Sequence, residues 1–235
     1  MSYTFAIGDL HGRSDLLEKA LSAIYAYDMA GGTVVFTGDY VDRGPDSRGV
    51  LDILKRGPKD DKWRFVCLRG NHEDMQIQWS KHQIGAGLYM ANGGRETLLS
   101  YSADVNDPNG YATISHDHLE WIEQLPYYYE DEFRVYVHAF CEPYVPLEEQ
   151  DAYKMTWRVY PGHAEGGYWG SNRAETPKHV VHGHEPLPNG PERHAYRTNI
   201  DTCAWYTGRL AVEVFHDLTP GRSVDSFDVV EALAL

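Results

Sequence analysis

The first third of the chain alternates short apolar runs with amphipathic segments. Tyr3–Ile7, Thr33–Thr37 and Arg64–Leu68 are rich in β-branched and aromatic residues and predict buried strands. A helix is predicted from Ser14, which we expect to be its N-cap, to the pair Gly31-Gly32. Its apolar face repeats at helical spacing: Leu16, Leu17, Ala20, Leu21, Ile24 and Tyr25. A second helix is predicted from about Asp46 to Lys55, and another after the third strand.

Alternating strands and helices predict parallel strands joined by right-handed crossovers. Each of the three strands runs into a polar loop, so the loops meet at one edge of the sheet, where such folds bind ligands. Phe133–Val137, which leads into His138, and His179–Val181, which leads into His184, repeat this pattern.

The pattern changes after Asn199 to closely spaced apolar segments, near Ile200–Thr202, Arg209–Phe215 and Val224–Val230. We interpret these as a second, mixed sheet packed against the first. The fold class predicted is therefore α/β, with two central sheets flanked by helices. One domain is expected over residues 1–235, since the sequence has no repeat or Pro/Ser-rich linker.

Composition excludes several classes of protein. Hydrophobic residues make up 42% of the chain, which supplies a sizeable core, but no apolar run is long enough to cross a bilayer. The N-terminus lacks the pattern of a signal peptide, so a cytoplasmic location is expected. Cys67, Cys141 and Cys203 are too widely spaced for a disulfide framework or a thiolate zinc site. A net charge of −14 argues against a nucleic-acid polymer as partner.

The polar residues at the strand ends have the chemistry of metal ligands. They are carboxylates, an amide and imidazoles without a thiolate, a set that suits manganese, iron or zinc and fits two ions better than one. The candidates are Asp9, His11, Asp39, Asn71, His138 and His184. Each alone has an ordinary alternative, a turn residue for Asn71 or a hydrogen-bonded core histidine for His138. The metal hypothesis depends on their occurring together.

Three longer motifs resemble a known family. Gly8-Asp9-Leu10-His11-Gly12, Gly38-Asp39-Tyr40-Val41-Asp42-Arg43-Gly44 and Arg69-Gly70-Asn71-His72-Glu73 are similar, in order and separation, to the signature motifs of the PPP-type metallophosphoesterases. Val137-His138-Ala139 and Gly183-His184 resemble the two later histidine motifs. The region around Asn92-Gly93-Gly94 looks like the bacterial branch, which contains serine/threonine protein phosphatases and diadenosine tetraphosphate hydrolases.

The resemblance implies roles for individual residues. Asp9, His11 and Asp39 would hold one divalent ion, and Asp39, Asn71, His138 and His184 the other, with manganese the first choice. Arg43 and Arg69 would bind the phosphate oxygens, and His72, held by Asp42, would protonate the leaving oxygen. Trp157-Arg158 resembles a third phosphate contact at an altered spacing, with an ordinary surface arginine as the alternative. His182 alternates with His184 along a strand and should face away from the site.

Three positions depart from the family's pattern. Phe140 and Cys203 stand where glycine is usual, and Glu185 where threonine is common. None is a proposed ligand, but Phe140 and Glu185 are expected to reshape the pocket wall.

The reaction implied is attack of a metal-activated water on phosphorus, without a phosphoenzyme. Serine/threonine phosphoproteins or small phosphate esters are the expected substrates, and no membrane partner is expected. The alternatives are a dinucleoside polyphosphate hydrolase and a non-catalytic scaffold, which the complete set of motif residues argues against. Diadenosine tetraphosphate hydrolases of this kind are usually longer at the C-terminus, which favours the phosphatase.

Overall fold

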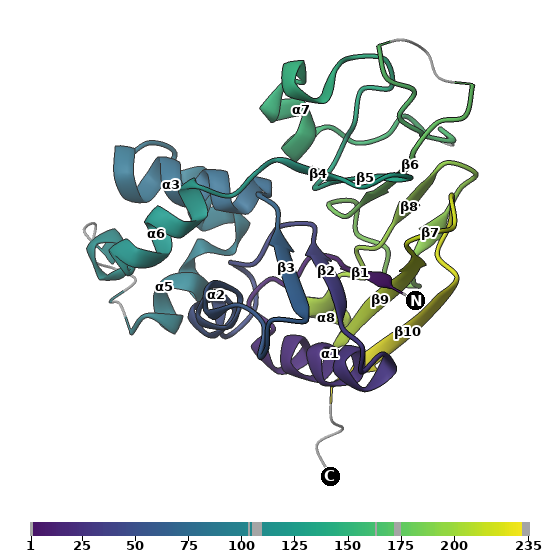
Figure 1. Ribbon diagram of the computed structural model, residues 1–235. Coiled ribbons are helices and arrows are strands. Elements are labelled where there is room, and N and C mark those ends of the chain that lie inside the picture. The colour runs from purple at the N-terminus through teal and green to yellow at the C-terminus, as the bar shows by residue number, and fades with distance from the viewer. Residues whose placement is uncertain (1, 103, 105–109, 163, 172–174, 232–235) are drawn as a thin grey trace.

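Two five-stranded mixed sheets form the centre of the computed structural model, which describes residues 2–102, 104, 110–162, 164–171 and 175–231 (Figure 1). In the first sheet the order is β10-β9-β1-β2-β3, and in the second it is β4-β5-β6-β8-β7. The strands of the first sheet are β1 (Tyr3–Ile7), β2 (Gly32–Phe36), β3 (Trp63–Cys67), β9 (Arg209–His216) and β10 (Asp225–Val230). Those of the second are β4 (Tyr128–Glu130), β5 (Arg134–Val137), β6 (His179–His182), β7 (Glu192–Arg193) and β8 (Arg197–Asn199).

Each sheet combines three parallel strands with two antiparallel strands. Strands β1, β2 and β3 are parallel, as the alternation of strands and helices predicts, and so are β5, β6 and β8. Strands β9 and β10 extend the first sheet antiparallel, and β4 and β7 form antiparallel edges of the second.

Helices flank the two sheets (Figure 1). The α-helices are α1 (Ser14–Tyr27), α2 (Ser47–Arg56), α3 (Asn71–His82), α4 (Ala86–Tyr89), α5 (Arg95–Ser100), α6 (His116–Glu123), α7 (Ala152–Trp157) and α8 (Ala204–Thr207). Other helical turns cover Met90–Gly94, Gly110–Thr113 and Leu147–Glu149. Within the described residues, none of the helices could cross a membrane.

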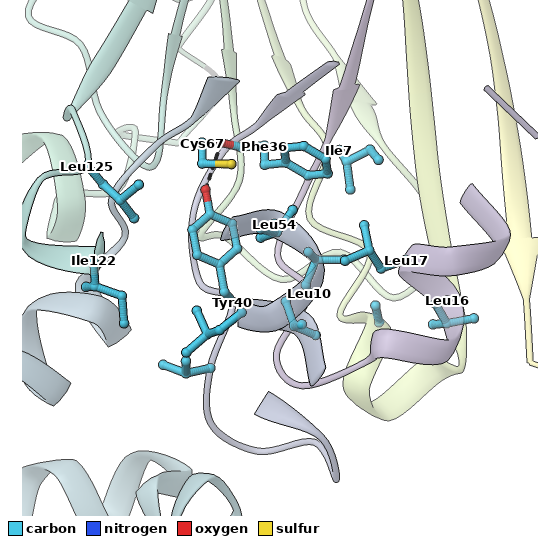
Figure 2. Packing of buried hydrophobic residues seen from close by; sticks show 14 of the residues in the cluster. Ile7, Leu10, Leu16, Leu17, Phe36, Tyr40, Leu54, Cys67, Ile122 and Leu125 are labelled. Carbon is cyan, nitrogen blue, oxygen red and sulfur yellow. Dashed lines mark hydrogen bonds between the residues drawn. The ribbon is translucent and has the colours of Figure 1, made fainter. Parts of the chain in front are cut away.

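The alternation of side chains along each strand divides the core. Ala6 of β1 faces the second sheet, where it joins Tyr136 and Val181 in one buried cluster. Its neighbours Phe5 and Ile7 point the other way and pack with the helices. Figure 2 shows Leu17 of α1 and Leu54 of α2 beneath Ile7 and Phe36. Strand β1 is therefore buried on both faces, between helices and the second sheet.

From the sequence, the wrong strands were assigned to the second sheet. Strands β9 and β10 belong to the first sheet, and Ile200–Thr202 forms no strand. The second sheet is built around β5 and β6, the two segments that repeat the pattern of the first three strands. Six consecutive residues of β9, Leu210–Phe215, are buried, as an interior strand between β1 and β10 requires. The apolar pattern identifies such a segment as a strand. It does not show which strand it pairs with, because tertiary contacts determine the pairing.

The start of α1 also differs from the prediction. Arg13 occupies the N-cap position, and Ser14 Oγ donates instead to Asp46 Oδ2, at 2.6 Å. Asp46 is the N-cap of α2 and accepts a hydrogen bond from the Gly49 N–H at 2.9 Å. One carboxylate thus fixes the starts of both helices, which follow the first two strand-end loops.

Candidate functional site

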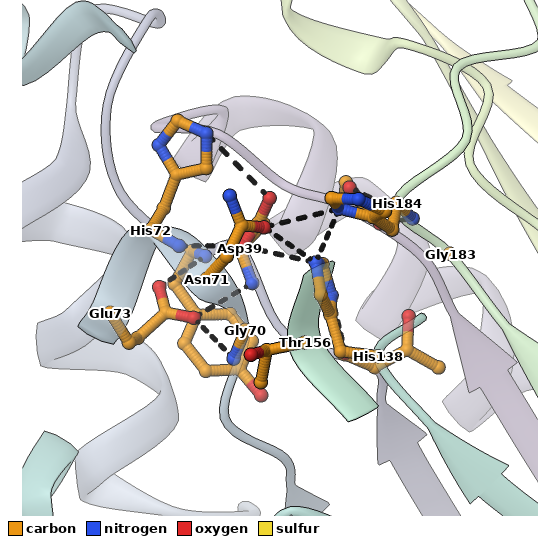
Figure 3. Close-up of polar contacts among 12 residues, drawn as sticks. Asp39, Gly70, Asn71, His72, Glu73, His138, Thr156, Gly183 and His184 are labelled. Atoms are coloured by element: carbon orange, nitrogen blue, oxygen red, sulfur yellow. Dashed lines mark hydrogen bonds and ion pairs between the residues drawn. The ribbon is translucent and has the colours of Figure 1, made fainter. Parts of the chain in front are cut away.

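The strand-end loops of both sheets meet in one buried cluster (Figure 3). Asp39 follows β2, Asn71 begins α3 after β3, and His138 and His184 follow β5 and β6 of the second sheet. His138 Nε2 lies 2.9 Å from Asn71 Oδ1, 3.1 Å from His184 Nδ1 and 3.4 Å from Asp39 Oδ1. The structure therefore brings together four predicted ligands that are widely separated in sequence.

Asp39 lies at the centre of two groups of possible ligand atoms. One group is Asp39, His138 and His184, and the other is His11, Asp39 and His72; within each, the ligand atoms are all within 4.8 Å of one another. His11 Nε2 is 3.6 Å from Asp39 Oδ2. A carboxylate shared by two groups of donors is the arrangement that a bridged pair of cations requires.

Backbone carbonyls orient two of the imidazoles. His11 Nδ1 donates to the Val41 carbonyl at 2.8 Å, and His138 Nδ1 donates to the Thr37 carbonyl at 3.0 Å. Since a carbonyl can only accept, Nδ1 carries the proton and Nε2 of each neutral ring presents its lone pair to the cluster. Metal-binding histidines in proteins are commonly fixed this way.

Asp9 joins the cluster from the side of His184. Its two carboxylate oxygens accept from the His184 N–H at 3.1 and 3.2 Å. A second buried acid, Asp201, faces it, and burial together with the charges of Asp201 and Asp39 raises the pKa of Asp9 well above its usual value. Burial raises the pKa of Asp201 to about 6.

Burial disfavours the charged forms of the carboxylates and imidazoles throughout the cluster. It raises the pKa of Asp39 well above its usual value and lowers the pKa values of His11 and His138 well below theirs. The pKa of His184 falls to about 4, mainly for the same reason. Neutral imidazoles are the form that binds metals, and a cation would stabilise the ionised carboxylates. The donor set therefore fits divalent ions.

The backbone around the cluster is held in an unusual conformation. Eight non-glycine residues in the described part of the chain have φ between +40° and +71°, and five belong to the predicted site: His11, Asp39, Asp42, Arg43 and His184. Such residues are uncommon, and they concentrate at functional sites. A Cβ on Gly70 would lie 2.2 Å from Asp39 Oδ1, and one on Gly183 would lie 2.0 Å from Asp9 Oδ1. The two glycines thus leave the space that the carboxylates occupy.

His72 and Asp42 form a buried pair beside the cluster. His72 Nδ1 lies 2.7 Å from Asp42 Oδ2, while Asp42 Oδ1 accepts from Thr97 Oγ1 at 2.6 Å. Burial raises the pKa of Asp42 to about 8 and lowers the pKa of His72 well below its usual value, so neither charge is stable alone. His72 Nε2 is 3.8 Å from Asp39 Oδ2 and has no hydrogen-bond partner among the described residues.

The three predicted phosphate-binding arginines lie in different surroundings. Arg43 is inside the cluster, with Nη1 3.1 Å from His11 Nε2. Arg69 is turned toward Asp74, with Nε 2.6 Å from Oδ1, and toward the carbonyl of Glu123. Arg158 is exposed and follows Trp157, whose ring centre is 6.3 Å from that of His184.

Sequence reasoning missed Glu73 and Asp201. The carboxylate of Glu73 accepts from the backbone N–H groups of Asp39, Tyr40 and Gly70, at 2.8, 2.8 and 2.9 Å. It thereby ties the second strand-end loop to the third. Asp201 follows β8 and could have been found by the same strand-end rule. Glu73 is the N3 residue of α3, a position where glutamate commonly accepts from the N-cap N–H, but no pattern in the sequence indicates its bonds to Asp39 and Tyr40.

His182 lies outside the cluster. Its Nε2 lies 3.2 Å from Arg197 Nη1 and its Nδ1 2.9 Å from the Gly183 carbonyl. The three cysteines are free and buried.

Several known proteins with related sequences or folds are named as phosphatases or tetraphosphatases. The serine/threonine-protein phosphatase 1 of Salmonella typhimurium is 26% identical over 89% of this chain and 90% of its own length. A bis(5'-nucleosyl)-tetraphosphatase of Bacillus mycoides is 26% identical over 87% of each chain. A crystal structure of a protein proposed to be a diadenosine tetraphosphatase superposes with a TM-score of 0.66 at 22% identity, covering 99% of this chain and 95% of that one.

A family model supports the same conclusion over most of the sequence. The model described as calcineurin-like phosphoesterase matches residues 4–220, which include every residue of the cluster. The strand-end loops, the buried carboxylates and the imidazoles all lie within this span, and we conclude that the chain belongs to the calcineurin-like phosphoesterase family.

Proposed function

We propose that this phosphoesterase is a metal-dependent phosphomonoesterase whose substrates are phosphoserine and phosphothreonine proteins. The observation that carries the proposal is the buried donor cluster centred on Asp39, with Arg43 inside it and the unpartnered His72 Nε2 beside it. The Salmonella phosphatase, similar along nearly its whole length, supports the substrate class. The domain boundaries 1–235 and a cytoplasmic location stay predictions from the sequence.

Two divalent ions would be held by the residues of the cluster. Asp9, His11 and Asp39 would hold one, and Asp39, Asn71, His138 and His184 the other. Manganese is our first choice because the donors are oxygen and nitrogen, and iron and zinc are the alternatives. When bound, such ions neutralise phosphate charge and lower the pKa of water.

The protein's own side chains would supply the remaining chemistry. Arg43, Arg69 and Arg158 would bind the phosphate oxygens, because a guanidinium keeps its charge and its planar fork matches two oxygens. His72 would give a proton from Nε2 to the oxygen that leaves phosphorus, so that the product departs as an alcohol. Asp42, at 2.7 Å from Nδ1, would orient the ring and stabilise its protonated form.

A second candidate function is hydrolysis of dinucleoside polyphosphates. The tetraphosphatase of Bacillus mycoides has the same 26% identity to this chain as the phosphatase and aligns along 87% of its own length. Chain length therefore does not favour the phosphatase, contrary to the expectation from the sequence.

Parallel assays with manganese distinguish the two functions. A panel of phosphoserine and phosphothreonine peptides and diadenosine tetraphosphate would be offered to the wild type, with Asp39→Asn as the inactive control. We expect a higher kcat/KM on the best peptide. A higher kcat/KM on the dinucleotide would replace the proposed substrate class, and no hydrolysis of either would refute both.

A further inference from the structure

Each predicted phosphate-binding arginine lies against an aromatic ring. The guanidinium carbon is 5.7 Å from the ring centre of Trp205 for Arg43, 5.5 Å from that of Tyr127 for Arg69, and 4.4 Å from that of Phe140 for Arg158. The Arg158 contact is the shortest of the three. It is also the one at which an aromatic residue stands where the family usually has glycine.

Arg158 depends on this ring more than the other two arginines depend on theirs. Arg43 also donates to His11, and Arg69 is paired with Asp74. Within the described residues, the side chain of Arg158 has neither a hydrogen bond nor an ion pair. A cation held by its flat face keeps its N–H edges available for an anion.

Phe140 is itself rigidly supported. It comes two residues after His138, is 7% exposed, and packs against Tyr160 with ring centres 4.7 Å apart. The Tyr160 N–H donates to Glu185 Oε1 at 3.0 Å, and Glu185 directly follows His184. The ring under Arg158 is thus attached to both histidine loops of the second sheet.

The backbone of Arg158 is attached to the same loops. The Ala139 N–H donates to the Met155 carbonyl at 2.8 Å, which fixes the end of α7 beside His138. Trp157, the last residue of α7, packs against His184. The chain at Arg158 therefore lies beside the donor cluster, and its guanidinium lies over the ring of Phe140.

We propose that Phe140 is a positioning residue for Arg158, which holds the guanidinium at the rim of the cluster for an anionic oxygen of the substrate. Tyr160 and Glu185 support the ring. The inference rests on the proposed function for the identity of the anion. It assigns a shared purpose to Phe140 and Glu185, two of the three positions that depart from the family's pattern.

The first measurement reports on Arg158 without metal or turnover. The Nε–H signal of Arg158 in a ¹⁵N NMR spectrum is assigned by its loss in Arg158→Lys. We expect an order parameter above about 0.6 in the wild type and in Phe140→Tyr, and a lower value in Phe140→Leu and Phe140→Met. A low order parameter in the wild type would overturn the proposal. Equal order parameters in the wild type and in Phe140→Leu would also overturn it.

The second measurement is a double-mutant cycle with orthophosphate as a competitive inhibitor of the manganese-loaded enzyme. Phe140→Leu should raise the inhibition constant about 3-fold to 10-fold, as expected for loss of a cation–π contact. In the Arg158→Met background it should have no further effect. Phe227→Leu, which removes a ring of the distant β10, controls for a general loss of packing.

If Phe140→Leu raises the inhibition constant equally with and without Arg158, the ring does not act through Arg158, and the proposal is overturned. If no variant, the wild type included, hydrolyses any phosphate ester, the proposed function fails. The order parameters of Arg158 then decide the positioning role alone.

Discussion

Most residues proposed to do the chemistry sit in strained or desolvated surroundings. Asp39, Arg43 and His184 have left-handed backbone conformations, which cost on the order of 1–3 kcal/mol each for non-glycine residues. Cys203, at φ +54°, has the same conformation where the family usually has glycine. The surrounding hydrogen bonds hold this strain, so we expect substitutions here to act through geometry as well as through the lost side chain.

His72 offers a direct test of acid catalysis. His72→Asn keeps a polar side chain but cannot deliver a proton, so it should slow substrates in proportion to how much their leaving group needs one. We expect kcat/KM on a phosphoserine peptide to fall by about 10²-fold or more, and much less on an aryl phosphate with an acidic phenol. Esters of graded leaving-group pKa measure the slope.

Asp42→Asn is the companion variant and should show the same bias more weakly, because Asp42 would only orient and charge His72. A distorted metal site would instead slow all esters by a common factor. A dependence on leaving-group pKa no steeper than that of the wild type would remove His72 from the role of acid.

His179 of β6, away from the cluster, predicts a pH dependence of stability. Burial, together with Arg134 and Arg222, lowers its pKa from 6.5 to about 4. The stabilisation is complete above pH 6.5 and is lost as the pH falls toward 4, because the unfolded chain then binds a proton that the native protein refuses. The unfolding free energy of the wild type should fall between about pH 7 and about pH 5. In His179→Gln this fall should be smaller by about 2 kcal/mol.

Urea unfolding of the chelated protein at both pH values measures this change. His116→Gln, an exposed histidine of α6, is the control. If His179→Gln shows the pH dependence of the wild type, His179 is not the group that titrates.

At the scale of elements, the strand-end loops are held as a unit by Glu73. Its position in the first turn of α3 lets one carboxylate serve three backbone donors from two loops. The ligands Asp39 and Asn71 are placed by these loops. Their spacing is thus a property of the β2 and β3 loops together with α3.

Replacing Glu73 by Gln should loosen both loops. The amide keeps one acceptor oxygen but directs an NH₂ group at a backbone N–H, so we expect the unfolding free energy to fall by about 2–3 kcal/mol. Metal affinity should fall about 10-fold or more, since supporting residues orient the ligands. Urea unfolding and metal titration measure the two effects, with the exposed Glu18→Gln as the control. Unchanged metal affinity would show that Glu73 is not needed to place the ligands.

The sequence predicts the elements near the site better than it predicts the sheets. Strands β1, β2 and β3 and their polar ends could be located because each is a short apolar run followed by ligand-type residues. The pairing of β9 with β1 could not be predicted, because it depends on contacts between residues about 200 positions apart in the chain. Arg43 and Arg69 were both predicted to bind phosphate. Their different partners, His11 and Asp74, depend on side-chain packing that the motifs do not predict.

At the scale of the whole molecule, the donor cluster joins the two sheets. Asp39 comes from a loop of the first sheet, and His138 and His184 come from loops of the second. A ligand that binds the assembled cluster and not the unfolded chain stabilises the folded state as its concentration exceeds Kd. Metal binding should therefore stabilise the packing of one sheet on the other.

Chelation should consequently lower both activity and thermal stability. With metal at about 100 times Kd, its removal costs about 2.7 kcal/mol, which lowers Tm by about 5–10 °C in a chain of this size. Manganese should restore both. Asp39→Asn should lose at least one ion and most activity while remaining folded, with the exposed Asp61→Asn as the control. An active Asp39→Asn protein that retains two ions by elemental analysis would refute the bridging role.

The place of β9 in the first sheet also has a consequence during biosynthesis. Strand β1 can pair with β2 as soon as the first 36 residues have left the ribosome, but its other edge pairs with Arg209–His216. Throughout the synthesis of the residues between them, that edge presents unpaired N–H and C=O groups to other nascent chains. This edge of β1 therefore stays open to incorrect pairing until the residues of β9 have been synthesised.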